Sequence, residues 1–453
     1  MSIFKAYDIR GIYPDELTEQ NIFKIGKAFV KLLKEENPHK QKLKIVVGND
    51  MRLSSPSLKK SLVQAVTSMG ADVVDIGLSS TPNYYFAVAA HGYDGGMIIS
   101  ASHNPKEYNG IKIVRAEAKA IGLVNGLDKI EKYSQQEIKE AEVKGKIVEH
   151  KGILQERVKF ALSFYDFSKI KPLKVVADTA NAMGGPELEE LFNHLPCELI
   201  KMNFKLDGSF PAHQANPLNE ENLEYLKKKV LEEKADLGIA TDGDADRFFF
   251  IDNKGNLVEP AILRGYLAKI ILQHNPGSKI CYDIRPGKIT HDLIVENGGK
   301  PIITKVGHTL IKKKAIEEGA EFAGESSGHF FIKTKHGFFE TPLIVTLIIL
   351  NEISKSGKAL SEIVAPLRKY SHSGEINFKV QNKEAMIKKI EINFKDAKEI
   401  RHLDGLSIIY DNFWFNIRPS NTESLLRLNL EAIDNKTMEE KRDLIIGLIK
   451  NKD

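Results

Sequence analysis

Three aspartates at alternate positions of the loop TDGDADR give the clearest chemical signal in the chain. Asp242, Asp244 and Asp246 stand between two apolar runs, and the small residues Gly243 and Ala245 separate them. A tight bend of this kind can turn several carboxylates toward one point, and hard divalent cations such as Mg²⁺ bind oxygen ligands of this type. The loop therefore predicts a magnesium site in preference to a solvated turn.

An EF-hand is the calcium-binding alternative for this spacing. It would need glycine at the sixth loop position and glutamate at the twelfth, where this chain has Arg247 and Asn253. The flanking segments also read as strands, whereas an EF-hand loop joins two helices. The sequence therefore argues against an EF-hand.

Ser102 follows an apolar run in IISASHNPKEYNG, residues 98–110. A serine at the carboxyl end of a parallel strand lies where open α/β sheets place their ligands. The sequence offers neither an Asp-His relay nor a G-x-S-x-G elbow, so Ser102 is a poor acyl nucleophile. It can still carry a phosphoryl group if a cation neutralises the phosphate, with the adjacent His103 orienting its oxygen. Taken alone, an ordinary turn is the simpler interpretation.

Two further loops supply groups suited to a sugar and to a phosphate. GESSGH, residues 324–329, alternates acceptors and donors of the kind that sugar hydroxyls need, at Glu325, Ser327 and His329. RPSNTE, residues 418–423, combines a guanidinium with hydroxyl, amide and backbone donors, which are the components of a phosphate-binding loop. Its candidate residues are Arg418, Ser420, Asn421 and Thr422. Each loop alone could be a surface turn, but all four loops together indicate a phosphorylated sugar.

Composition narrows the function classes. The 453 residues include 65 Lys and Arg against 61 Asp and Glu, a net charge of +4, which is far from the basic excess of a nucleic-acid-binding protein. The first residues, MSIFKAYDIRG, lack the apolar region of a signal peptide, and the longest apolar run, residues 342–350, is too short to span a bilayer. Cys197 and Cys281 lie in apolar runs and are expected to be buried thiols. We expect a cytoplasmic protein with no nucleic-acid or membrane partner.

The elements that must position these loops follow from the hydrophobic pattern. Short β-branched runs such as residues 42–48, 72–77 and 95–101 alternate with amphipathic stretches such as 56–70, which is typical of α/β domains. Beyond residue 368, closely spaced strands with two helices indicate an α+β module. The predicted domains are 1–148 with the serine loop, 149–253 with the metal loop, 254–367 with the sugar loop and 368–453 with the phosphate loop.

The four loops, in this order, resemble the α-D-phosphohexomutase superfamily, most closely its phosphomannomutase/phosphoglucomutase branch. The resemblance runs from FKAYDIRG at 4–11 to NTESLLRLNLEA at 421–432. It implies three similar mixed or parallel α/β domains and a smaller C-terminal domain around a central cleft. It also implies an isomerase that transfers a phosphoryl group within mannose and/or glucose phosphates, between the 1- and 6-positions. The cofactors implied are Mg²⁺ and a hexose 1,6-bisphosphate that is activator and intermediate.

The resemblance assigns roles to individual residues. Ser102 corresponds to the phosphoserine, and its phosphate completes a Mg²⁺ site with Asp242, Asp244 and Asp246. The sugar loop and the phosphate loop take the roles described above, with Arg418 holding the phosphate that is not being transferred. Further active-site positions are Arg10, His103, Lys112 and Arg247, assigned to catalysis, and Tyr7, Arg285 and His308, assigned to substrate binding. Lys112 is the candidate for proton transfer or for stabilising charge on the sugar oxygen.

The chain departs from the family pattern at several positions. Ala245 replaces a usual glycine, Ser326 stands where methionine or glutamine is common, Ser424 stands where proline often follows, and Arg285 lies where some relatives have lysine. The residue type at position 326 therefore does not indicate which sugar is the substrate. For the oligomeric state, the sequence is compatible with a monomer and with a small homo-oligomer.

Three alternatives to this function remain. A phosphoglucosamine mutase typically opens with G-T-D-G-[IV]-R-G, which is absent here. A haloacid-dehalogenase-type phosphatase would share the aspartate spacing but not its context, and it would release free phosphate. A non-catalytic sugar-phosphate-binding protein would bind without turnover.

Overall fold

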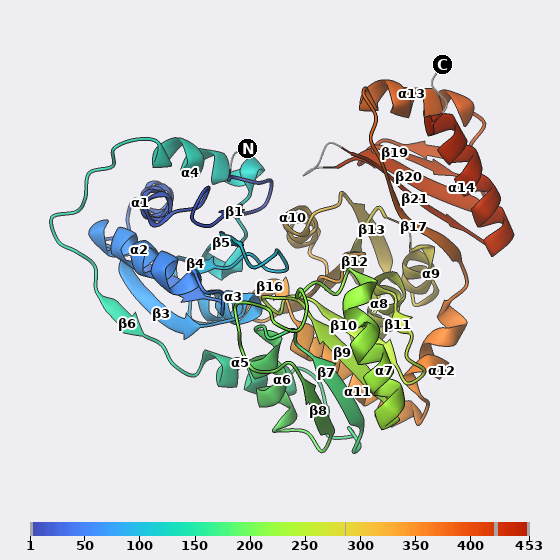
Figure 1. Cartoon of the computed structure of the whole chain (residues 1–453), viewed down its shortest axis with the longest axis horizontal. Helices are drawn as coiled ribbons and strands as arrows, with labels where there is room; N and C mark the ends of the chain where they lie inside the picture. Colours follow the sequence, from blue (N-terminus) through green and yellow to red (C-terminus); the bar gives the residue numbers. More distant parts are fainter. Residues whose placement is uncertain (1–2, 286, 421–424, 451–453) are drawn as a thin grey trace. The chain divides into compact units, whose positions relative to one another are not determined.

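The computed structural model of the chain describes residues 3–285, 287–420 and 425–450, and Figure 1 shows their path. The chain divides into two units. The first comprises Met1–Val258 and Gly328–Ser361, and the second comprises Glu259–Ser327 and Glu362–Asp453. Each unit is described by itself below.

The N-terminal part of the first unit is a six-stranded sheet in the order β1-β5-β4-β2-β3-β6 (Figure 1). Strands β4, β2, β3 and β6 are parallel, whereas β5 is antiparallel to both β4 and β1. The strands are β1 (Ile9–Ile12), β2 (Lys44–Asn49), β3 (Asp72–Leu78), β4 (Gly95–Ile99), β5 (Tyr108–Arg115) and β6 (Ile147–Glu149), and the helices are α1 (Glu19–Glu36), α2 (Ser55–Ser68), α3 (Thr81–Ala90) and α4 (Leu127–Ser134).

Both faces of this sheet are covered, which explains why β2 and β4 are apolar without alternation. Ile45 and Val47 pack in the core that includes Phe29 of α1, while Val46 packs in a second core with Tyr84 of α3. The loop of Ser102 follows β4 and lies at the end of the sheet where the parallel strands β2 and β4 terminate.

The remainder of the first unit contains the metal loop. Its sheet has the order β11-β10-β9-β7-β8, in which β8, β7 and β9 are parallel and β10 is antiparallel to β9 and β11. The strands are β7 (Lys174–Asp178), β8 (Glu198–Met202), β9 (Leu237–Thr241), β10 (Phe248–Asp252) and β11 (Leu257–Val258), and the helices are α5 (Ile153–Leu162), α6 (Gly184–Phe192) and α7 (Glu224–Glu233). The hairpin of β15 (Phe330–Thr334) and β16 (Gly337–Glu340) and the helix α11 (Pro342–Ser356) also belong to this unit.

The apolar run at 342–350 lies in α11, where its side chains are buried in the protein. Among the described residues, no helix is both long and apolar enough to cross a membrane.

The second unit begins with parallel strands β13-β12-β14 and ends with an antiparallel sheet in the order β17-β21-β20-β19-β18. Its first part contains α8 (Pro260–His274), β12 (Lys279–Asp283), α9 (Lys288–Glu296), β13 (Lys300–Thr304), α10 (His308–Glu318) and β14 (Phe322–Gly324). After α12 (Leu360–Val364) come β17 (Ser371–Phe378), α13 (Lys383–Asn393), β18 (Glu399–Arg401), β19 (Leu406–Ile409), β20 (Phe413–Pro419), β21 (Leu426–Ala432) and α14 (Asn435–Lys450).

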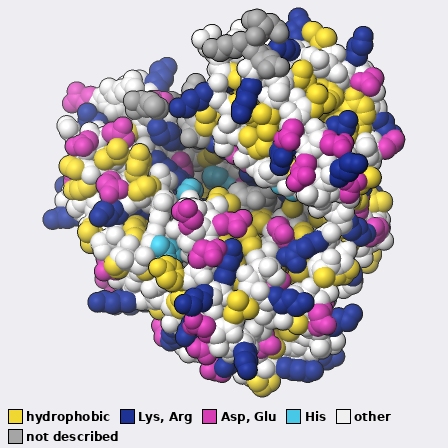
Figure 2. All heavy atoms as spheres, turned by 45° about the vertical axis from the view of Figure 1, so that its right-hand side comes forward, with side chains coloured by type: hydrophobic (Ala, Val, Ile, Leu, Met, Phe, Trp, Pro, Cys, Tyr) yellow, Lys and Arg dark blue, Asp and Glu magenta, His cyan; other side chains and the backbone are white. Residues whose placement is uncertain are grey.

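These sheets confirm the predicted fold class of mixed α/β domains followed by an α+β module. The central cleft stays a prediction. Cys281 is buried in β12 as expected, but Cys197 is only half-buried because it precedes the partly exposed strand β8, so the expectation for this thiol was wrong. On the face shown in Figure 2, basic and acidic side chains are interspersed, as the near-balanced charge predicts.

Candidate active site

The metal loop is the tight connection between β9 and β10. Ala245 adopts a left-handed conformation with φ of 59°, and its backbone N–H donates to the Asp242 carbonyl at 3.2 Å. This turn gathers the carboxylates of Asp242, Asp244 and Asp246, each of which offers an oxygen within 4.8 Å of the others. All three side chains are buried.

The loop contains more negative charge than its neighbours neutralise by direct contact. Lys112 donates to Asp244 at 2.5 Å and to Asp246 at 2.6 Å, and Arg247 donates to Asp242 through both Nε and Nη2. Burial raises the pKa of Asp242 to about 7, although Arg247 opposes this effect. The buried Asp244 Oδ1 accepts no hydrogen bond from any described residue. Clustered carboxylate oxygens with an orphaned lone pair fit a hard divalent cation.

Ser102 lies directly beside this loop. It follows β4 and has a φ of 51°, a left-handed conformation that is uncommon outside glycine. Its Oγ donates to Asp242 Oδ2 at 3.0 Å. The two backbones also touch, because a Cβ on Gly243 would lie 2.2 Å from the Ser102 carbonyl oxygen. The structure therefore brings together the four residues that were predicted as metal ligands.

The Ser102 loop is held by Arg52, which the sequence analysis did not identify. This buried guanidinium donates to four backbone carbonyls, those of Ser102 and Asn104 through Nη2 and those of Pro105 and Tyr108 through Nη1, at 2.7–2.9 Å. An available signal was a charged residue three positions after the buried strand β2. These bonds fix the backbone of the Ser102 loop, and none of them is to a carboxylate of the metal loop.

His103 and Arg247 connect the two loops. Arg247 Nη2 donates to His103 Nδ1 at 2.6 Å, so this nitrogen carries no proton, and Ser102 Oγ lies 3.2 Å from it. Burial and the adjacent Arg247 hold the pKa of His103 well below its ordinary value. The lone pair of this neutral imidazole orients the Arg247 guanidinium, while the Ser102 hydroxyl donates to Asp242.

Of the other candidates of the first unit, Arg10 and His329 contact these loops. Arg10 on β1 donates to Asp8 at 2.8 Å and to the side chain of Asn104. Tyr7 precedes β1 and is half-buried. His329 lies 3.5 Å from Asp246 Oδ1, so the structure places it with the metal loop, whereas the sequence grouped it with Glu325 and Ser327.

The second unit carries the sugar loop. Ser327 donates to Glu325 Oε2 at 3.2 Å, and Glu325 Oε1 accepts from the Gly307 backbone N–H at 2.9 Å, next to His308 at the start of α10. Arg285 pairs with Asp283 at 2.5 Å and lies 3.9 Å from Glu325. Four of the predicted substrate-binding residues are thus neighbours.

Ser326, one of the departures from the family pattern, forms hydrogen bonds with buried side chains of the second unit. Its hydroxyl donates to Asp283 Oδ1 at 2.8 Å and accepts from Arg264 Nη1 at 3.2 Å. Arg264 also donates to Asp283 at 2.7 Å, and both of these side chains are fully buried. The Ser326 side chain therefore stabilises the base of the sugar loop.

Arg418 lies on β20 and is almost fully buried. It faces Arg427 across the strand pair β20–β21, and Glu375 lies 3.6 Å from Arg418 and 3.0 Å from Arg427. Burial and the nearby Arg285 lower the pKa of Arg418, and its Nε has no hydrogen-bond partner among the described residues. A bound anion would satisfy this group. Ser420 ends the described part of this loop, and Asn421 and Thr422 lie outside the described residues.

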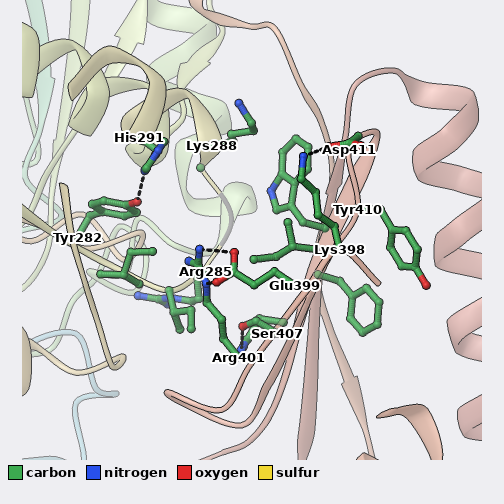
Figure 3. A pocket seen from close by; sticks show the side chains of 17 residues that line it. Tyr282, Arg285, Lys288, His291, Lys398, Glu399, Arg401, Ser407, Tyr410 and Asp411 are labelled. Atoms are coloured by element: carbon green, nitrogen blue, oxygen red, sulfur yellow. Dashed lines mark hydrogen bonds and ion pairs between the residues drawn. The ribbon is translucent and has the colours of Figure 1, made fainter. Parts of the chain in front are cut away.

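A cavity of about 310 Å³ separates the start of α9 from strands β18–β20 in the second unit (Figure 3). Figure 3 shows Tyr282 directed at His291, with 2.9 Å between Oη and Nδ1, and Arg401 paired with Glu399 at 2.8 Å. Among the candidate site residues, only Arg285 lines the described part of this cavity.

Beside the cavity, Glu431 of β21 accepts hydrogen bonds from the backbone N–H groups of Gly287 and Lys288 at 3.1 and 2.9 Å, and from Trp414 Nε1 at 2.8 Å. The C-terminal sheet is therefore bonded to the first turn of α9, two residues after Arg285.

Comparison with known proteins gives a consistent result over the whole chain. Residues 1–141, 154–255 and 261–370 match the models of α/β/α domains I, II and III of phosphoglucomutase/phosphomannomutase, and residues 375–447 match its C-terminal domain. A phosphomannomutase of Methanocaldococcus jannaschii is 41% identical over 99% of this chain and 98% of its own length. A phosphomannomutase of Vibrio cholerae is 37% identical over 100% and 99%, respectively.

A crystal structure of a phosphoglucomutase/phosphomannomutase family protein from Burkholderia thailandensis has the same fold. It superposes with a TM-score of 0.89 at 30% identity, covering 99% of this chain and 97% of that one. The matches extend over the metal loop, the serine loop and the loops of the second unit. The chain is therefore a phosphohexomutase-type enzyme that belongs to the phosphoglucomutase/phosphomannomutase family.

Proposed function

We propose that the chain interconverts hexose 1-phosphate and hexose 6-phosphate, with mannose and/or glucose as the sugar, through a phosphorylated Ser102. The observation that carries this proposal is the contact between Ser102 and the metal loop. Ser102 Oγ lies 3.0 Å from Asp242, and three buried carboxylates gather beside it. A phosphate on this oxygen would stand among like charges, so it requires a cation at the same place.

The proposed reaction is a double transfer. The Oγ–P bond of phosphoserine 102 breaks as a P–O bond forms to the free hydroxyl of the sugar phosphate, and the proton of that hydroxyl passes, in the net balance, to the Ser102 oxygen. The product is a bound hexose 1,6-bisphosphate. It turns around, and its other phosphoryl group passes to Ser102. The P–O bond to the sugar breaks as a P–O bond forms to Ser102 Oγ, and the proton of the serine hydroxyl passes to the released sugar oxygen. Mg²⁺ held by Asp242, Asp244 and Asp246 would neutralise charge on the transferred group.

The residues around Ser102 have separable tasks in this scheme. Arg247 positions the serine oxygen through Asp242, which accepts from both Arg247 and Ser102 Oγ, and His103 accepts from the same guanidinium. Lys112 is an ammonium bonded to Asp244 and Asp246. This contact supports a role in stabilising negative charge more directly than a role as proton acceptor, since both of its short contacts are to carboxylates.

The second unit supplies groups suited to holding the sugar phosphate. Arg418 has a buried guanidinium with an unsatisfied Nε, and it would bind the phosphate that is not being transferred. Arg418 would therefore bind a phosphate group in both half-reactions. Glu325 and Ser327 would instead bind sugar hydroxyls, whose positions exchange when the intermediate turns.

This division of labour is testable. In Arg418→Ala, kcat/KM should fall by similar factors for 1-phosphate and 6-phosphate substrates, whereas Glu325→Gln should change the preference between mannose and glucose. A large defect confined to one isomer in Arg418→Ala would mean that Arg418 is not a common phosphate ligand.

The decisive experiment is mass spectrometry of the peptide that contains Ser102. Part of the purified protein should carry a phosphate there, and incubation with hexose phosphate should exchange it. Ser102→Ala should abolish mutase activity, while Ser57→Ala, an exposed serine in α2, should not. A coupled assay primed with hexose 1,6-bisphosphate should compare mannose, glucose and glucosamine 1-phosphates. Full activity of Ser102→Ala would refute the scheme, and stoichiometric release of free phosphate would indicate a phosphatase.

A further inference from the structure

A second cluster of potential metal ligands lies in the first unit, outside the site described above. His91, His150 and Glu156 each offer a ligand atom, and these atoms lie within 4.8 Å of one another. Glu156 Oε2 is 2.8 Å from His91 Nε2, and Glu156 Oε1 is 3.4 Å from His150 Nε2. We propose that these three residues bind a divalent transition-metal ion, with Zn²⁺ as the best fit.

The ligand types and distances support this choice. Zn²⁺ binds imidazole nitrogen and carboxylate oxygen at about 2.0–2.2 Å, commonly with two histidines, one carboxylate and a water. Tetrahedral geometry at these bond lengths places neighbouring ligand atoms about 3.3 Å apart. The observed separations lie on either side of this value, with 2.8 Å from His91 Nε2 to Glu156 Oε2 and 3.4 Å from His150 Nε2 to Glu156 Oε1. Because all of the ligand atoms lie within 4.8 Å of one another, side-chain movements of up to about 1.5 Å would complete the site.

The surroundings of His150 already orient its ring. Tyr93 Oη lies 2.9 Å from His150 Nδ1, and a hydroxyl can either donate to this nitrogen or accept from it. When the hydroxyl accepts, Nδ1 carries the proton and Nε2 presents its lone pair to the metal. Metal-ligating histidines almost always have such a partner on the second nitrogen. The rings of His91 and His150 also meet edge to face, with centroids 4.4 Å apart.

The cluster differs chemically from the metal loop. Mg²⁺ prefers an all-oxygen site such as the three aspartates, whereas imidazole ligands select zinc, cobalt, nickel and copper. The side chains of His91, His150 and Glu156 are 29%, 21% and 42% exposed. A metal ion can therefore enter from solvent and keep a water as its fourth ligand.

The position of the cluster suggests what the metal would do. His91 caps the C-terminus of α3, His150 follows β6, and Glu156 lies in the first turn of α5. The family models place His91 in domain I and Glu156 in domain II, with His150 in the segment between them. A bound ion would thus fasten the connection between two consecutive domains, and it would stabilise the first unit without entering the reaction.

The test is a titration of the full-length protein with Co²⁺ and with Zn²⁺ in saturating Mg²⁺. Co²⁺ should produce the visible absorption of a tetrahedral site at one equivalent, and Zn²⁺ should displace it and raise Tm. His91→Gln, His150→Gln and Glu156→Gln should each weaken this binding at least tenfold. His194→Gln is the matched control, because it removes a surface histidine paired only with Glu190 at 3.5 Å among the described residues.

Since the three side chains are at least partly exposed, the variants should fold, and circular dichroism checks that they do. Any Co²⁺ or Zn²⁺ bound at the three aspartates remains in the variants, so only the part lost on substitution counts for the proposal. Equal titrations of the parent and the three variants, or no binding at all, would overturn it. The cluster would then be a hydrogen-bonded link between α3 and α5 only.

Discussion

Replacing Gly243 with alanine should separate the metal loop from the Ser102 loop. The added Cβ would lie 2.2 Å from the Ser102 carbonyl oxygen and 3.0 Å from its carbonyl carbon. Because an ordinary C···O contact is about 3.3 Å, the two backbones must move apart by about 1 Å. Neither obstacle is a side chain that could rotate away. Gly243 has no positive φ, so alanine is otherwise tolerated and the effect isolates this contact.

The expected cost has two parts. Overpacking of this kind destabilises a protein by about 1–3 kcal/mol. A displacement of about 1 Å between a reacting atom and its partners lowers activity by about 100-fold. We therefore expect kcat/KM to fall by about two orders of magnitude and the Mg²⁺ concentration needed for half-maximal activity to rise.

The assay compares Gly243→Ala with Gly447→Ala, a control in α14 whose new Cβ would meet no described atom within 4 Å. The control should keep full activity and gain up to about 1 kcal/mol of stability, as alanine does in a helix. Coupled kinetics, urea unfolding and the phosphorylated fraction of Ser102 are measured on both. If Gly243→Ala had parental kcat/KM and unfolding free energy, the close approach of the two loops would be wrong.

Three further substitutions test other parts of the structure. Arg52→Met removes the donor to four carbonyls and should cost at least about 3 kcal/mol in urea unfolding; a loss below 1 kcal/mol would mean that solvent replaces these bonds. The hydrogen bond that His213 donates to Asp178 raises the pKa of His213, although burial of the ring opposes this effect, so this pair stabilises the fold fully below the unfolded-state pKa of about 6.5 and loses its effect as pH rises through the folded-state pKa. His213→Asn should remove this component from unfolding free energies measured between pH 5 and pH 9, and an unchanged pH dependence would contradict the assignment. Ser326→Ala should lose about 1 kcal/mol of stability through its bonds to Asp283, while the ratio of mannose to glucose activity stays the same; a changed ratio would show that Ser326 contacts the sugar.

The sequence was sufficient to predict four residues that the structure brings together at the metal loop, while their roles stay predictions. Asp242, Asp244 and Asp246 are acidic residues between apolar strands, and Ser102 follows a buried strand. Residue type and strand-end position are local properties, and the topology of open α/β sheets then brings such loops together. The same reasoning selected Arg418 as a candidate beside turn residues, and the structure places it near the end of strand β20, while its role as a phosphate ligand stays a prediction.

Residues whose role depends on strand register or on backbone atoms were missed. Arg427 and Glu375 flank Arg418 only because β20, β21 and β17 pair in one particular register, which hydrophobic alternation alone does not fix for a polar face. Arg52 bonds to carbonyl groups, and every residue has one, so the sequence gives no sign of its partners. His329 was grouped with the sugar loop because it is close in sequence, but the chain turns at Gly328 and directs it to Asp246.

Backbone strain in the two loops explains why the site needs so many supporting contacts. Ser102 and Ala245 both adopt left-handed conformations, each of which costs about 1–2 kcal/mol for a residue with a Cβ. Such strain persists only where surrounding structure over-determines it. Arg52 holds the Ser102 loop through four charge-assisted bonds, and the Thr81 backbone N–H donates to the Asp244 carbonyl at 3.0 Å on the other loop. The strain on each side is thus offset by groups outside the metal site, so Ser102 Oγ and the carboxylates can adopt the arrangement that the proposed phosphoryl transfer requires, although local stability does not favour it.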